Sequence, residues 1–286
     1  WEEAGLNGWS PPLGRVRRRW SFVREALDRA AVRIVPARNQ TLSDRLAMIG
    51  YADADGPALL RETARSCGDT WRILLLGIVD DIAVVDWTRG RQFCSLRFDG
   101  VQDYHLRVSA APVWHERLTR RYPMAMAALA LPRAERVIRV VGLVTATVRV
   151  EVKHGEVLVR CRADDIALME VEPDTLTPVS SAHELAIARA LVHERRSFIR
   201  PLRFDAARDV VLPDFVLTDT EDARGTPMEV FGRADEAYAA RRAEKARYYD
   251  EVYGQEHWWS WDAVASPDRW PAFAPALPRV GGEEDV

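Results

Sequence analysis

The chain has 286 residues, of which 48% are hydrophobic and 29% are charged, and its formal net charge is −3. This length predicts two domains, and the composition excludes a chain that is disordered along most of its length. No run of about 18 apolar residues occurs, which excludes a membrane-spanning helix, and the charge excludes a global basic field that would attract nucleic acid.

Two features of the sequence bear on where the protein works. Its three cysteines, Cys67, Cys94 and Cys161, are widely spaced and fit neither a zinc site nor an even-numbered disulfide set. We therefore expect a reducing, cytoplasmic environment. The sequence begins at Trp1, with no signal-like apolar stretch after it, and we interpret it as a piece of a longer chain.

Residues 1–175 are expected to form an α+β domain. Apolar residues at helical spacing predict helices in four segments, with a break at Pro123 in the last of them: residues 20–32, 42–50, 57–66 and 112–129. Runs of strand length follow one another with turn signals between them and predict an antiparallel meander and then further strands: residues 71–79, 81–87, 91–98, 136–152, 156–163 and 165–171. These strands carry no recognisable site.

A Pro/Thr/Ser-rich linker at residues 173–180 marks the domain boundary. The second domain is expected to span residues 176–263, and the Pro-rich residues 264–286 to form a loose tail. Ser181 with Glu184 three positions later has the spacing of a capping box. The expected order is a helix, three strands and a helix: residues 182–195, 196–205, 211–219, 227–232 and 234–253.

Two carboxylates stand out in these strands. Asp214 and Glu229 lie 15 positions apart on adjacent strands of one hairpin, so their side chains can converge. Carboxylate oxygens are preferred Mg²⁺ ligands, and the metal can bridge to phosphates. The alternative is that both residues belong to a solvated strand face, and the spacing alone slightly favours this second interpretation.

Residues 180–253 resemble the PD-(D/E)XK nuclease-like superfamily, including proteins related to very-short-patch repair endonucleases. The helix with Glu184, the sequence Pro213-Asp214-Phe215, the sequence from Glu229 to Gly232 and the following helix carry this resemblance. It implies metal binding by Asp214, Glu229 and the backbone carbonyl of Val230, with Glu184 assisting directly or through water. The fold that it implies is a restriction-endonuclease-like α/β domain.

The sequence departs from the superfamily at one position. Phe231 stands where the superfamily has its lysine, two residues after the glutamate. A basic residue of the next helix can take over this role, and Lys245 and Arg241 are the candidates. Lys245 is one of only two lysines among 40 basic residues, and its compact ammonium group differs chemically from a guanidinium. The alternative is a solvent-exposed ion pair of Lys245.

A second resemblance covers most of the chain. The opening WEEAGLNGWSP and the later VLPDFVLTDT, PMEVFG and WWSWDA are similar to a bacterial family of unknown function often carried on plasmids and integrative elements. This resemblance implies a link to a mobile genetic element and a preceding cysteine-containing region. It implies no activity.

Basic and aromatic residues supply candidate nucleic-acid contacts. Arg196 and Arg200, in a basic stretch at residues 189–203, are candidates for contacts to the phosphate backbone, together with Arg241. A solvated helix end explains the basic stretch equally well. The tryptophans at positions 258, 259 and 261 can stack on unpaired bases, although such a cluster more often caps a core.

These residues lead to one principal hypothesis and one alternative. The principal hypothesis is hydrolysis of DNA phosphodiesters with Mg²⁺ or Mn²⁺ on Asp214 and Glu229, while Lys245 orients the attacking water. The alternative is a catalytically degenerate nuclease-like fold that acts as a nucleic-acid-binding or assembly subunit. DNA is the expected partner, a membrane is not, and protein partners and oligomeric state stay open.

Overall fold

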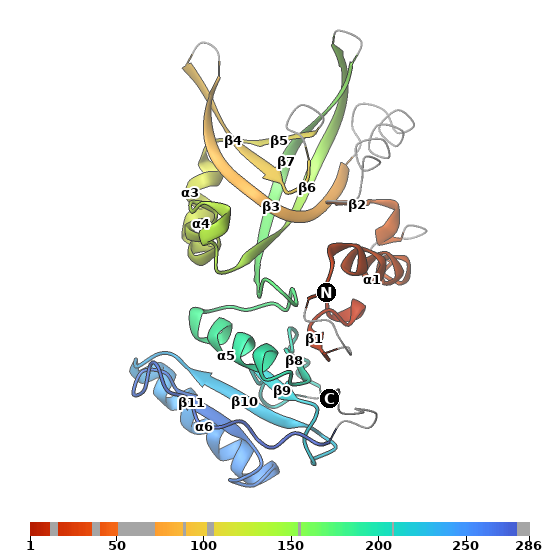
Figure 1. Cartoon of the computed structure of the whole chain (residues 1–286). Helices are drawn as coiled ribbons and strands as arrows, with labels where there is room; N and C mark the ends of the chain where they lie inside the picture. The colour runs from red at the N-terminus through yellow and green to blue at the C-terminus, as the bar shows by residue number, and fades with distance from the viewer. Residues whose placement is uncertain are drawn as a thin grey trace, which may run out of the picture. The chain divides into compact units, whose positions relative to one another are not determined.

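The computed structural model describes residues 1–11, 17–35, 41–50, 72–87, 90–101, 106–153, 156–207 and 209–278. The chain forms two compact units, and both are mixed α and β (Figure 1). One unit spans Arg17–Pro178, and the other joins Trp1–Val16 to Val179–Val286. The first residues join the second unit because β1 (Gly8–Trp9) pairs antiparallel with β8 (Phe198–Ile199).

The unit of residues 17–178 begins with the expected helix, α1 (Trp20–Arg33). The helix expected at 42–50 is wrong: a 3₁₀ turn (Leu42–Asp44) leads into strand β2 (Leu46–Ile49), which pairs parallel with the next strand. A short apolar run fits a buried strand as well as a helix. The helix expected at 57–66 lies outside the described residues.

Five strands of this unit close into a barrel. They are β3 (Arg72–Trp87), β4 (Arg91–Phe98), β5 (Leu106–Ala110), β6 (Arg139–Lys153) and β7 (Glu156–Val171). Neighbours follow the order β3-β4-β5-β7-β6, and β6 pairs with β3 to close the sheet. Only the β5–β7 contact within this ring is parallel. A closed five-stranded barrel with this connectivity has the architecture of an OB-fold.

Two pairs of expected strands are in fact single long strands. The segments 71–79 and 81–87 form β3, and 156–163 and 165–171 form β7. Asp80 and Asp164 are the extra residues where the register shifts. A β-bulge bends a strand without ending it, which lets the first part of β3 pair with β6 and the second part with β4.

The segment between β5 and β6 forms the expected interrupted helix. It consists of α3 (Val113–Arg121) and α4 (Pro123–Leu129), and a 3₁₀ turn (Arg133–Glu135) follows. Pro123 is the first residue of α4, where its missing N–H costs no helical hydrogen bond. The break predicted at Pro123 is confirmed.

The second unit is a mixed sheet with two long helices. Its strand order is β1-β8-β9-β10-β11, with β9 (Phe215–Leu217), β10 (Thr226–Phe231) and β11 (Trp259–Asp262). Strand β9 pairs antiparallel with both β8 and β10, and β11 pairs parallel with β10. The helices are α5 (Ala182–His193) and α6 (Glu236–Val252), close to their expected bounds, and a short 3₁₀ turn (Glu2–Ala4) precedes β1.

The two helices cover opposite faces of this sheet. On one face the ring of His183 in α5 contacts Trp261 at 5.5 Å, and on the other Lys245 of α6 bonds to Glu229. Glu229 pairs with Ser260 and Val230 with Trp261, so side-chain alternation separates the two contacts. Figure 1 shows strands β10 and β11 between α5 and α6.

The C-terminal aromatic residues belong to the core of the second unit. Trp259 and Trp261 are 5% and 2% exposed, which favours the core-capping interpretation over base stacking. Beyond β11, Trp270 packs against Trp261 and Phe273 against Trp259, each with ring centroids 5.4 Å apart. The described part of the expected loose tail is therefore anchored. None of the helices in the described ranges is long and apolar enough to cross a membrane.

The barrel interior depends on a pair of glycines. Gly77 of β3 and Gly142 of β6 are register partners, and the ring of Phe98 lies against both positions. A Cβ atom at Gly77 would lie 2.7 Å from Phe98 Cδ1 and 2.8 Å from the carbonyl oxygen of Ile49. These separations are too short for a side chain, so glycine is required there.

We expect Gly77→Ala to lower the free energy of unfolding by about 1–3 kcal/mol, because the added methyl group must displace the buried Phe98 ring and a strand backbone. Gly8→Ala is the control: that residue also lies in a strand, and its nearest contacts would be 3.4 Å or longer. Urea unfolding of both variants tests this. Equal stability of the two variants would contradict the packing argument.

Candidate active site

The carboxylate of Glu229 is buried in the middle of β10, where its residue is 2% exposed. Both of its oxygens accept hydrogen bonds from Lys245 Nζ at 2.8 Å, and Oε1 also accepts one from the Tyr249 hydroxyl at 2.8 Å. Lys245 Nζ also donates to the Leu212 carbonyl oxygen at 2.9 Å. Burial, and after it the charge of Asp214, raise the pKa of Glu229 to about 7 despite these partners.

Asp214 enters the site from the strand next to Glu229. Its backbone N–H donates to the Met228 carbonyl oxygen at 3.0 Å, and its Oδ2 accepts a hydrogen bond from the Val230 N–H at 2.8 Å. These bonds fasten the start of β9 to β10 on either side of Glu229. Burial, followed by the charge of Glu184, raises the pKa of Asp214 to about 6.

Glu184 comes from the first turn of α5 and is 8% exposed. Its backbone N–H donates to the Ser181 side chain, which confirms the predicted N-cap. Its Oε2 accepts hydrogen bonds from the Ser180 N–H at 2.8 Å and from Arg200 Nη2 at 2.6 Å. The chain thus holds Glu184 in one orientation, close enough for its charge to act on Asp214.

The arrangement brings together residues that are far apart in the sequence. Glu184 comes from α5, Asp214 immediately precedes β9, Glu229 lies in β10 and Lys245 in α6, and their charges act on one another. Burial is the larger cause of both raised pKa values, and a neighbouring carboxylate raises each of them further. Within the described ranges, no group of three or more His, Cys, Asp or Glu side chains is arranged to hold a metal ion.

The donor atoms nevertheless suit a hard cation. Asp214 and Glu229 offer carboxylate oxygens, and the Val230 carbonyl oxygen, next in sequence to Glu229, accepts only a long bond, 3.4 Å, from the Tyr238 hydroxyl. Oxygen donors of this kind are those that Mg²⁺ takes, usually one or two carboxylates with water completing the shell.

Phe231 and Lys245 lie on the same side of the sheet as Glu229. Phe231 and Glu229 are two residues apart on one strand, so their side chains point to the same face. The Phe231 ring is buried, and the guanidinium of Arg242 lies over it, 4.6 Å from the ring centroid. Lys245 lies three residues further along α6, on the same helical face, and reaches Glu229 from there.

The arginines expected to contact nucleic acid are placed differently. Arg196 is 5% exposed and its guanidinium is bonded to Asp219, with Nη2 2.8 Å from Oδ1. Arg200 is 8% exposed and bonded to Glu184, Ser180 and the Pro201 carbonyl. Because both guanidinium groups are buried in the fold, neither is available to a phosphate backbone. Arg241 lies on the exposed surface of α6.

Tyr249 is the site residue that the sequence analysis missed. It is 1% exposed and its hydroxyl bonds to Glu229. The signal was present, because Tyr249 lies four residues after Lys245 and therefore on the same side of the helix. Two polar side chains at this spacing in a helix that covers a buried carboxylate indicate a shared partner.

Comparison with known proteins places the chain in a family. It belongs to the family described as "Protein of unknown function (DUF1173)", which matches residues 1–264, as the whole-chain resemblance to a family of unknown function predicted. No curated protein matches the sequence.

Two solved structures show distant likenesses to the chain. Rim1, a mitochondrial single-stranded DNA binding protein from S. cerevisiae, is 9% identical with a TM-score of 0.25, over 36% of this chain and 98% of that one. RecJ from Thermus thermophilus, in complex with Mn²⁺, is 20% identical with a TM-score of 0.22, over 51% of this chain and 18% of that one. Scores this low carry no argument about function.

The raised pKa of Asp214 makes stability depend on pH. The folded protein holds this proton up to about pH 6, whereas the group's ordinary pKa is 3.8. The contribution of the protonated Asp214 carboxyl group to the free energy of unfolding is therefore complete below about pH 4. This contribution is lost as the pH rises through about 6.

Asparagine cannot ionise, so the Asp214→Asn variant should not lose this stabilisation. As the pH rises from 4.5 to 7.5, we expect its free energy of unfolding to increase by about 1–3 kcal/mol relative to that of the unmodified protein. Urea unfolding at a series of pH values measures this gain. Glu236→Gln, which neutralises an exposed carboxylate of α6, is the control. A gain as large in Glu236→Gln, or none in Asp214→Asn, would contradict the expected effect of burial.

Proposed function

We propose that the C-terminal unit hydrolyses DNA phosphodiester bonds with Mg²⁺ or Mn²⁺. One observation carries the proposal: Asp214, just before β9, lies close enough to Glu229 of β10 for their charges to interact, and Lys245 from the next helix donates directly to Glu229. This agrees with the PD-(D/E)XK resemblance if Lys245 replaces the lysine that is missing at position 231. The order of α5, three antiparallel strands and α6 gives further support.

The groups suited to hold the metal are the carboxylates of Asp214 and Glu229 and the carbonyl of Val230. When bound, the metal polarises the scissile phosphate and lowers the pKa of the attacking water. The Val230 N–H fixes the Asp214 carboxylate, and Tyr249 fixes that of Glu229, so both ligands are oriented in advance. Such preorganisation is what a functional carboxylate pair requires.

Lys245 is the group best suited to act on water. Its ammonium has three donors, and Glu229 and the Leu212 carbonyl oxygen hold it in place. The side chain is 30% exposed, so it borders solvent and the buried carboxylates at once. An ammonium in this position orients a water molecule and offsets negative charge that develops on a phosphate.

Glu184 is a positioning residue in this scheme. Arg200 and the Ser180 N–H hold its Oε2, and its charge acts on Asp214. It orders water around the Asp214 carboxylate. Arg200 supports Glu184 from within the fold, which replaces its earlier assignment as a phosphate contact.

Loss of a metal ligand is the first test. We expect Asp214→Asn to abolish both Mn²⁺ binding, measured by calorimetry, and cleavage of a DNA substrate panel, because a carboxamide oxygen lacks the charge that holds a divalent cation. Glu236→Gln serves as the charge-matched control and should bind and cleave as the unmodified protein does. Full cleavage by Asp214→Asn would sink the proposal, and so would the absence of both Mn²⁺ binding and cleavage in the unmodified protein.

A second test separates metal binding from chemistry. Lys245→Met removes the ammonium from Glu229 and leaves the metal ligands in place, so we expect Mn²⁺ binding to persist while the cleavage rate falls about 10²- to 10⁴-fold, the range for loss of a proton-handling group. Lys245→Arg should recover little activity, because a planar guanidinium does not reproduce the ammonium contacts. Unchanged cleavage in Lys245→Met would exclude a catalytic role for this residue.

A further inference from the structure

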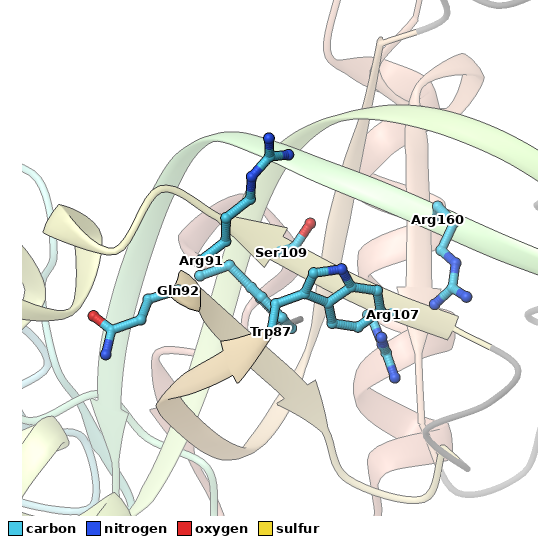
Figure 2. Close-up of a pocket in the computed structure, with 7 residues that line it drawn as sticks. Trp87, Arg91, Gln92, Arg107, Ser109 and Arg160 are labelled. Atoms are coloured by element: carbon cyan, nitrogen blue, oxygen red, sulfur yellow. The ribbon is translucent and has the colours of Figure 1, made fainter. Parts of the chain in front are cut away.

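The barrel unit has an open hollow on its outer surface that the sequence analysis did not find. Its volume is about 400 Å³, within the range of small-ligand sites. It lies over the end of β3, the start of β4, and strands β5 and β7. Its lining residues, six of them labelled in Figure 2, are Trp87, Arg91, Gln92, Phe93, Arg107, Ser109 and Arg160.

Strand alternation produces this surface. On β5 the side chains of Leu106, Val108 and Ala110 fill the barrel, and those of Arg107 and Ser109 point outward. The same alternation buries Cys94 and Leu96 of β4 and turns Arg91 and Phe93 to the outside. The hollow therefore lies on the wall of a rigid barrel.

Aromatic side chains form one part of the hollow. Trp87 is 50% exposed, which is unusual for a tryptophan in a strand, because apolar surface of its indole stays in contact with water. Phe93 meets its ring edge-on with the centroids 5.7 Å apart, and the Arg107 guanidinium lies 5.5 Å from the Trp87 centroid. Figure 2 shows the indole beside Ser109 and Arg107.

Arginine side chains form the other part of the hollow. Three arginines, Arg91, Arg107 and Arg160, line the hollow, and none of the described residues that line it is acidic. Arg107 and Arg160 are register partners on the parallel strands β5 and β7. Like charges at paired positions repel each other, and a phosphate between them offsets this repulsion through charge-assisted hydrogen bonds.

We propose that this hollow binds single-stranded nucleic acid, with a base stacked at Trp87 and the adjoining phosphates held by Arg91, Arg107 and Arg160. An aromatic platform combined with a positive groove is the pattern that suits an unpaired strand, because its bases expose their faces. In a duplex those faces are stacked on one another. The site lies on a different unit from Asp214 and Glu229 and requires no metal.

The test measures binding of a fluorescein-labelled oligo(dT) of about 16 nucleotides, the upper site size of one such barrel, by anisotropy with the full chain in EDTA. EDTA prevents metal-dependent cleavage, so failure of the nuclease proposal does not affect the result. We expect binding that an unlabelled single strand of DNA or RNA displaces and a duplex displaces poorly. Failure to bind oligo(dT), or preference for the duplex, would overturn the proposal.

Variants locate the site. Trp87→Ala should weaken binding about 5- to 150-fold, as expected for the loss of one base–aromatic stack. Trp87→Phe should retain most of the affinity. Phe22→Ala, which removes an aromatic residue of the same unit that is 52% exposed, is the matched control. Equal losses in Trp87→Ala and Phe22→Ala would place any binding elsewhere.

The salt dependence tests the arginines separately. Each phosphate contact to a single strand contributes about −0.7 to the slope of log affinity against log salt, so Arg107→Gln should make the slope shallower by about 0.7. Arg120→Gln, at an exposed position of α3, should leave it unchanged. Thermal unfolding confirms that each variant is folded. A slope that Arg107→Gln leaves unaltered would contradict a phosphate contact in the hollow.

Discussion

The C-terminal unit depends on the burial of one carboxylate, that of Glu229. An ionised group in the centre of a strand, 2% exposed, is strongly unfavourable without partners. Lys245 and Tyr249, one helical turn apart, supply those partners, and Tyr249 is the one buried residue of α6. The position of α6 on the sheet and the charge state of Glu229 are therefore linked. Asp214 places a second buried carboxylate beside it, whose charge raises the pKa of Glu229 further.

The barrel unit depends on a different constraint, the closure of its sheet by the pairing of β3 with β6. An open sheet of the five barrel strands would end in two unpaired edges. Strands β3 and β7 each carry one extra residue that lets the strand curve, and β3 pairs with β6 to close the sheet. At Asp80 the extra residue also fastens the structure outside the barrel, because its carboxylate accepts hydrogen bonds from Arg97 and Arg133. Closure turns every second side chain outward on a fixed wall. The hollow at Trp87 is one consequence of that geometry.

The sequence predicts the parts of the structure that local chemistry determines. The caps and bounds of α5 and α6, the break at Pro123 and the convergence of Asp214 with Glu229 follow from spacing and residue type. The strands expected on either side of Asp80 and Asp164 are continuous, because an acid interrupts an apolar run equally between two strands and at a bulge. Only the pairing with distant strands decides between the two.

Contacts between residues far apart in the sequence account for the features that the sequence did not predict. Arg196 and Arg200 looked like surface charges because nothing local shows that Asp219 and Glu184 lie beside them in the fold. Lys245 stood out in the sequence through its rarity, but only the fold shows that it bonds to Glu229. The hollow went unnoticed because its arginines come from three strands, β4, β5 and β7, that the barrel brings together.

The net charge of −3 is consistent with a basic hollow in the barrel. Charges separated by more than about 8 Å are largely screened at physiological ionic strength, so a phosphate responds to the few groups next to it. Arg91, Arg107 and Arg160 are such groups, and Asp86, which accepts a hydrogen bond from Gln92 of the lining, offsets part of their charge. Composition excludes a protein that gathers nucleic acid from a distance. It does not exclude one that holds a single strand at a short range, where an exposed indole supplies the part of the affinity that salt does not weaken.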